Sequence, residues 1–117
     1  MSIRTARVAQ LVKEQISESL TRDIDTEGFG LMTVTDVIVT ADLRIAKVYI
    51  SHYQSGKTDE QILGFLDEHA KEIRMAVGRS VRLKFTPELR FFIDQTLDRV
   101  ERLEELIRKI HEDESSR

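Results

Sequence analysis

The sequence contains no cysteine, no tryptophan and a single proline. The absence of cysteine excludes disulfides, thiolate nucleophiles and zinc sites of the cysteine type, and it fits a reducing compartment. The amino-terminal residues lack the apolar run of a signal peptide, and no segment has the apolar length needed to cross a bilayer. We therefore expect a cytoplasmic protein with no membrane partner.

Length and charge narrow the class of protein further. A chain of 117 residues can form one domain with one hydrophobic core. Charged residues make up 33% of it and hydrophobic residues 40%, which is typical of a highly charged globular protein. The formal net charge of −3 argues against a protein that coats nucleic acid indiscriminately, because such binding needs an overall cationic field. A local cationic patch is compatible with this charge.

Candidate catalytic residues are few. The histidines, His52, His69 and His111, lie in separate predicted elements without the spacing of metal ligands. Ser51 and His52 are neighbours on a predicted strand, so their side chains point to opposite faces and cannot form a nucleophile and base pair. Residues 55–58 resemble the end of a phosphate-binding loop, but Ser51 stands where that loop requires glycine. We expect no catalytic residue, no metal and no cofactor.

The spacing of apolar residues predicts a mixed α+β domain. Helical spacing, β-branched runs and polar turns alternate along the chain. The elements that they indicate are a helix over residues 5–23, strands over 31–40 and 45–53 that form a hairpin, a long helical run over 59–85, a third strand over 89–94 and a terminal helix over 97–110. We expect one domain over residues 1–111 and an acidic, flexible tail over 112–117.

The long helical run has a clear start and a predicted interruption. Thr58 and Gln61 have the spacing of a capping box, which starts a helix. Pro87 cannot continue a helix, so it marks the end of the run. Gly78 lies well inside, where glycine costs roughly 1 kcal/mol relative to alanine. We therefore expect two helices that meet at a kink around residues 76–78, which gives the order α-β-β-α-kink-α-β-α.

The segment from Lys71 to Arg90 combines positive charge with helical amphipathicity. It holds six lysines or arginines and two glutamates, so its local charge is +4. One helical stripe comprises Lys71, Arg74, Gly78 and Arg82, with Arg79 beside it. The fork of arginine suits phosphate, and a glycine on the stripe would let a ligand backbone approach closely. The segment predicts a nucleic-acid-binding surface, with an ordinary solvated helix face as the alternative.

Several short motifs carry a resemblance to a known family. In chain order they are Arg4-Thr5-Ala6-Arg7-Val8, Val34-Thr35-Asp36-Val37, Asp42-Leu43, Ala46, Val48-Tyr49-Ile50-Ser51, Ile73-Arg74 through Leu83, and Pro87-Glu88-Leu89-Arg90-Phe91 followed by Asp94. Each motif is weak alone. Their order and spacing together resemble the ribosome-binding factor A family of small KH-like proteins, from about Arg4 to Ile110.

The resemblance implies both a fold and a function. The implied fold is a single KH-like α+β domain in the type II order α-β-β-α-kink-α-β, with an added C-terminal helix. The implied function is that of a ribosome assembly factor, not an enzyme. It would bind the immature small (30S) ribosomal subunit and promote late maturation and processing of 16S rRNA. The implied partners are that subunit and its 16S rRNA, and the free protein is expected to be a monomer.

The resemblance also indicates where RNA would bind. KH domains clamp the nucleic-acid backbone with a Gly-x-x-Gly loop between two helices. This chain lacks that loop, and Ala76-Val77-Gly78 matches an Ala-x-Gly kink that the family carries in its place. Basic side chains must therefore supply more of the contact. The residues that we expect to bind RNA are Lys71, Arg74, Ala76, Gly78, Arg79, Arg82, Lys84 and Arg90.

Two other functions remain open on the sequence. A protein-interaction module could dimerise through a zipper-like seam on the C-terminal helix, residues 97–110, although about two heptads is short for that purpose. A small enzyme would have to use His52. Neither alternative accounts for the excess of positive charge between Lys71 and Arg90.

Overall fold

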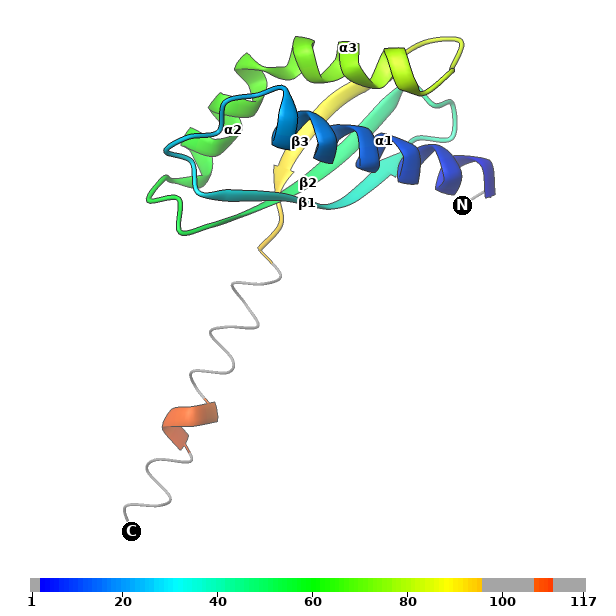
Figure 1. Ribbon diagram of the computed structural model, residues 1–117. Coiled ribbons are helices and arrows are strands. Elements are labelled where there is room, and N and C mark those ends of the chain that lie inside the picture. The colour runs from blue at the N-terminus through cyan, green and yellow to red at the C-terminus, as the bar shows by residue number, and fades with distance from the viewer. Residues whose placement is uncertain (1–2, 96–106, 111–117) are drawn as a thin grey trace.

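Three helices and a three-stranded sheet form residues 3–95 of the computed structural model, which also describes residues 107–110 (Figure 1). In chain order the elements are α1 (Ile3–Arg22), β1 (Leu31–Val39), β2 (Ile45–Tyr53), α2 (Asp59–Glu68), α3 (Ala70–Ser80) and β3 (Glu88–Ile93). The predicted α+β class and the KH-like order α-β-β-α-α-β are confirmed. The first helix, the hairpin and the third strand lie where the apolar spacing predicts them.

The sheet places two distant turns side by side. Its order is β1-β2-β3, with β1 and β2 antiparallel and β2 and β3 parallel. Parallel neighbours cannot be joined by a tight turn, so α2 and α3 form the crossover between β2 and β3. Ile45 therefore pairs with Glu88, and the Glu88 N–H donates to the Arg44 carbonyl over 2.8 Å. The hairpin turn thus meets the loop that precedes β3.

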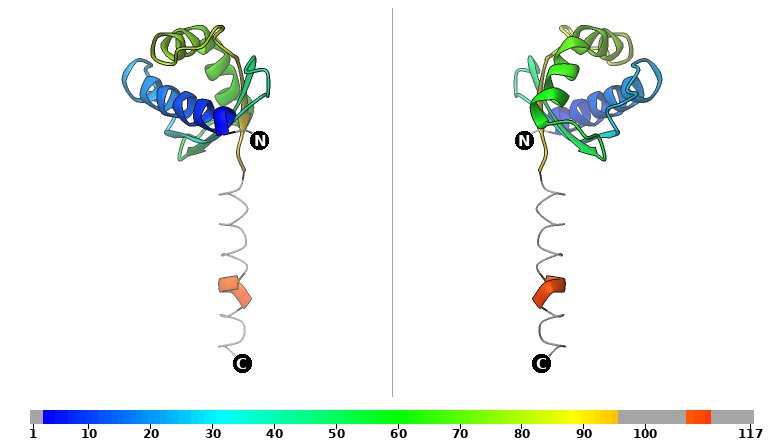
Figure 2. Two further views of the ribbon diagram at one scale, coloured as in Figure 1. Left: turned by 90° about the vertical axis from the view of Figure 1, so that its right-hand side faces the viewer. Right: turned by 90° about the vertical axis from the view of Figure 1, so that its left-hand side faces the viewer.

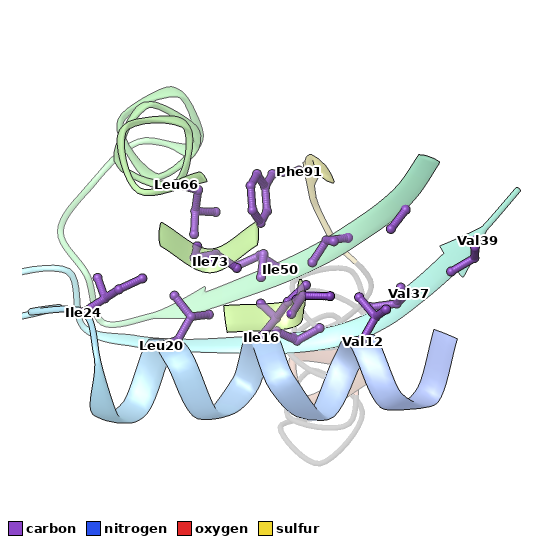
Figure 3. Close-up of a cluster of buried hydrophobic side chains, with 14 of the residues drawn as sticks. Val12, Ile16, Leu20, Ile24, Val37, Val39, Ile50, Leu66, Ile73 and Phe91 are labelled. Carbon is purple, nitrogen blue, oxygen red and sulfur yellow. The ribbon is translucent and has the colours of Figure 1, made fainter. Parts of the chain in front are cut away.

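The core lies between the sheet and the helices, all of which cover the same face (Figure 2). On α1, Val12 and Ile16 are fully buried, and their four-residue spacing keeps them on one side of the helix. On the central strand, Val48 and Ile50 alternate with residues that point away, and both are fully buried. Figure 3 shows Val12, Ile16 and Ile50 in one cluster with Leu66 of α2. The core fixes the helices rigidly on the sheet.

The break between the second and third helices lies at His69, so its predicted place around residues 76–78 is wrong. The capping box of Thr58 and Gln61 starts α2 as expected, with hydrogen bonds of 2.9 and 3.1 Å. His69 ends α2 with its ring packed on Phe65, the two ring centroids being 4.6 Å apart. Glycine permits a bend without requiring one. The bend forms where the packing partner changes, because α2 packs on β3 whereas α3 packs on α1.

The helical run also ends earlier than the apolar spacing predicts. Val81 has extended backbone angles, and its N–H closes the last turn by donating to Val77 O over 2.8 Å. Residues 81–87, hereafter the α3–β3 loop, are therefore not helical. Val81 and Leu83 still turn toward the core, but Arg82 and Lys84 point to solvent from the loop and not from a helical stripe.

The predicted terminal helix and tail lie mostly outside the described residues. Of residues 97–110, the structure describes 107–110, which are helical. The tail over 112–117 and most of the predicted dimer seam fall outside the described part. Among the helices of residues 3–95 and 107–110, none is long and apolar enough to span a membrane.

Candidate nucleic-acid interface

One face of α3 and the α3–β3 loop enclose a hollow of about 310 Å³. Its lining residues are Lys71, Arg74, Met75, Gly78, Phe85 and Thr86. Lys71 and Arg74 are exposed on successive turns of α3, which places both cations along the rim. The structure therefore brings together three of the residues predicted to bind RNA, namely Lys71, Arg74 and Gly78.

Arg74 and Gly78 attach the α3–β3 loop to the helix. The Arg74 guanidinium donates to the carbonyls of Thr86, over 2.9 Å, and Pro87, over 3.3 Å. A Cβ at position 78 would lie 2.9 Å from Thr86 Oγ1, so the close approach that this glycine allows is made by the loop. Arginine has five N–H donors, and these two bonds leave three for a ligand. The loop is thus held in one conformation beside the cationic rim.

A second hollow, of about 430 Å³, lies on the other side of the same loop. Its lining residues are Arg4, Ala41, Asp42, Leu43, Arg44, Leu83, Lys84 and Phe85. The cations come from three elements, because Arg4 belongs to α1, Arg44 to the hairpin turn and Lys84 to the α3–β3 loop. The pairing of β2 with β3 brings Arg44 next to the loop that carries Lys84. This hollow adds Arg4 and Arg44 to the predicted surface.

Phe85 lines both hollows. Its side chain is 59% exposed although it is large and apolar. Lys84 Nζ lies 5.6 Å from the centre of its ring, and Arg44 Cζ lies 5.9 Å away, both within cation–π range. The loop therefore carries an exposed aromatic ring with cations around it.

The carboxylate of Asp42 also lines the second hollow, but it is bound within the hairpin turn. The Thr40 hydroxyl donates to Asp42 Oδ1 over 2.6 Å, and the Arg44 backbone N–H donates to the same oxygen over 3.1 Å. These two hydrogen bonds, in that order of importance, lower the pKa of Asp42 below its ordinary value of 3.8. The charged carboxylate thus stabilises the hairpin turn that carries Arg44.

Four predicted RNA-binding residues line neither of these hollows. Ala76 is buried, so it packs within the fold. Arg79 faces α1, where it lines a separate hollow with Asp23 and Glu72. Arg90 lies on β3 next to buried Phe91, so it points to the sheet face opposite the helices, and its Nη2 lies 3.5 Å from Glu88 Oε2. Arg82 is exposed on the α3–β3 loop itself.

Sequence reasoning missed Arg4, Arg44 and Phe85 as members of this surface. Arg4 and Arg44 are distant in sequence from the basic segment, and only the parallel register of β2 and β3 makes Arg44 a neighbour of the loop. Phe85 continued the apolar spacing of the predicted helix, which placed it in the core. A usable signal was the alternation of residues 81–84, whose period of two contradicts a helix.

A separate polar cluster joins the end of β2 to the start of α2. His52 Nδ1 lies 2.7 Å from Ser55 Oγ, and His52 Nε2 lies 2.9 Å from Asp59 Oδ1. The hydroxyl partner of His52 is thus Ser55, which sequence reasoning did not consider. Ser55 Oγ also accepts the Lys57 backbone N–H over 3.1 Å, and Gln95 donates to the second Asp59 oxygen over 3.0 Å. These bonds hold the β2–α2 loop closed.

Comparisons with known proteins agree with the arrangement of elements. The family model described as ribosome-binding factor A matches residues 4–107. The ribosome-binding factor A of Halothermothrix orenii is 35% identical over 113 residues, which cover 97% of this chain and 93% of that protein.

Solved structures match as well. The crystal structure of ribosome-binding factor A from Thermus thermophilus superposes with a TM-score of 0.67 at 25% identity, covering 76% of this chain and 94% of that one. A Thermus thermophilus ribosome-binding factor A homology model, fitted into the cryo-EM map of a 30S complex, gives a TM-score of 0.63 at 24% identity, covering 78% and 94%, and shows the fold alone. Because the family model spans residues 4–107 and the Halothermothrix orenii protein matches nearly the whole chain, this protein belongs to the ribosome-binding factor A family.

Proposed function

We propose that this protein is a non-enzymatic assembly factor of the cytoplasm that binds the immature small ribosomal subunit and promotes late maturation and processing of 16S rRNA. Membership of the ribosome-binding factor A family supports the proposal. So does the 30S complex into which the Thermus thermophilus homology model was fitted. The observation that carries it for this chain is the cationic surface around the α3–β3 loop in a protein of net charge −3.

The proposed contact is to rRNA phosphates. Lys71, Arg82 and Lys84 are exposed cations on α3 and the α3–β3 loop. The Arg74 guanidinium has further N–H groups that are not bonded to the loop carbonyls. Phosphate contacts dominate the affinity of most nucleic-acid complexes and position the protein on its target. Arg79 and Arg90 would contact RNA only where the subunit wraps around the domain, because they face α1 and the far side of the sheet.

The proposed role needs no catalytic group. A protein held on an immature subunit by several phosphate contacts shifts the rRNA toward the conformation that it binds best, since a ligand favours the state for which its affinity is higher. The rigid attachment of the α3–β3 loop suits this role because a fixed arrangement of cations discriminates between RNA shapes. Processing of 16S rRNA would follow as a consequence of that shift.

Sucrose-gradient co-sedimentation tests the proposal. We expect the protein to travel with free small subunits more than with mature ribosomes, and a deletion strain to accumulate precursor 16S rRNA. The double variant Arg82→Glu with Lys84→Glu should bind small subunits weakly. Its log-log salt slope should be smaller by about two units, one for each lost phosphate contact.

The matched control reverses two charges elsewhere. Lys47 lies on the sheet face opposite the helices and Lys57 on the β2–α2 loop, and both are exposed. The double variant Lys47→Glu with Lys57→Glu should co-sediment as the wild type does. A folded Arg82→Glu with Lys84→Glu protein that binds as tightly as this control would refute the assignment of the surface.

A further inference from the structure

The exposure of Phe85 calls for a ligand of particular chemistry. Burying a phenylalanine side chain stabilises a protein, and at 59% exposure this residue forgoes much of that gain. Single exposed apolar residues are common and need no explanation alone. Phe85 differs because it lines two hollows, of about 310 and 430 Å³, and because Arg44 and Lys84 lie within cation–π range of its ring.

The loop backbone next to Phe85 is held in place by contacts on two sides. Pro87, two residues on, is fully buried, and Arg74 fixes the carbonyls of both Thr86 and Pro87. On the other side, the Glu88 N–H joins the loop to Arg44 O. Little loop motion therefore remains to be lost on binding, which favours affinity.

The chemistry of the surroundings selects the ligand. A flat aromatic face binds another flat ring, and Arg4, Arg44 and Lys84 beside it bind anions. An unpaired nucleotide combines a flat base with flanking phosphates, whereas the bases of double-stranded RNA are stacked and its deep groove is closed to side chains. We infer that Phe85 stacks on an unpaired base of RNA while Arg44 and Lys84 bind the phosphates next to it.

This inference rests on the proposed function, since it names the kind of rRNA that the same surface takes, namely an unpaired strand. It assigns to Phe85 a contact with a base, whereas the proposed function requires only contacts with phosphates. The two proposals predict different effects of mutation. Removing the ring should weaken binding without changing its salt dependence, whereas removing a cation should change both.

The first test measures binding of the full chain to a fluorescent single-stranded RNA and to a hairpin RNA of equal length. Phe85→Ala should weaken binding of the single strand about 5- to 150-fold, the range expected for loss of one stacked base, at an unchanged salt slope. Phe85→Tyr should restore it. Tyr53→Ala is the matched control, because Tyr53 is 56% exposed and lies at the end of β2 away from both hollows.

The second test uses the absence of tryptophan. In Phe85→Trp the new indole is the only one in the chain, and a base stacked on it should quench its emission when single-stranded RNA or small subunits are added. Tyr53→Trp should show no quenching. The inference would be overturned if the emission of Phe85→Trp were unquenched by both single-stranded RNA and small subunits, or if Phe85→Ala bound as tightly as wild type. If, in that case, the Arg82→Glu with Lys84→Glu variant still fails to co-sediment with small subunits, the proposed function stands without the inference about Phe85.

Discussion

Substitution of Gly78 by alanine tests why a glycine stands inside α3. Alanine is better than glycine in a helix interior by roughly 1 kcal/mol, so the change would stabilise an isolated helix. In this fold the new Cβ would lie 2.9 Å from Thr86 Oγ1, which is closer than such contacts occur in proteins. Overpacking of this kind costs typically about 1–3 kcal/mol. We expect Gly78→Ala to lower the free energy of unfolding by up to about 2 kcal/mol, because the clash exceeds the gain in helix propensity.

The cause can be isolated by removing the atom that clashes. In a Thr86→Ala background the next atom near the Cβ of residue 78 is 3.9 Å away, an ordinary contact. There, Gly78→Ala should raise the free energy of unfolding by up to about 1 kcal/mol. Urea denaturation of the four proteins gives the coupling energy of the pair, expected at about 1–3 kcal/mol. Equal effects of Gly78→Ala in both backgrounds would refute the packing of the loop on this residue.

The same double variant distinguishes packing from ligand approach at Gly78. If the glycine serves the loop, then Gly78→Ala with Thr86→Ala should co-sediment with small subunits as Thr86→Ala alone does. If RNA backbone must approach the helix here, the added methyl group would weaken binding even though the fold is stable. Loss of co-sedimentation in the double variant, with stability retained, would therefore favour the original interpretation of this residue.

Three further predictions follow from individual contacts. Arg74→Lys should lower the free energy of unfolding by about 1–3 kcal/mol in urea denaturation, because an ammonium cannot hold both loop carbonyls as the fork does. Asp42 has a lowered pKa, so its charged form stabilises the fold above pH 3.8, and this contribution is lost as the pH falls through the lowered pKa. The difference in urea midpoint between wild type and Asp42→Asn should shrink on that acidification. His52→Ala should cost about 1–3 kcal/mol and speed hydrogen exchange at the Lys57 amide, since it frees Ser55 and Asp59.

The sequence predicts the elements of this fold better than their junctions. Helix α1 and the hairpin follow from local spacing, and α2 begins at Thr58 because a capping box is a local device. The break at His69 depends on what each helix packs against, and no local signal carries that information. Gly78 was a misleading signal because its lack of a side chain leaves room for Thr86 of the α3–β3 loop and does not bend the helix.

Some residues of the candidate site could be predicted from the sequence, and others could not. Lys71 and Arg74 could be predicted because they share a face of one helix, which sequence spacing determines. Arg44 could not, since its place depends on the parallel pairing of Ile45 with Glu88, a contact between residues far apart in the chain. Phe85 fits both a helical spacing of four from Val81 and an alternation of two, and the tertiary fold decides between them. Arg44 and Phe85, which sequence reasoning missed, are thus brought together by the crossover.

The gathering of cations in a negatively charged protein has a consequence for selectivity. At physiological ionic strength charges are screened beyond about 8 Å, so under the proposed function RNA would respond to the cations around the α3–β3 loop before it responds to the net charge of −3. The proposed RNA contact would depend on a few side chains, which Arg74, Gly78 and the turn at Arg44 hold in place. We therefore expect the specificity of the proposed binding to come from the position of the charges and not from their number.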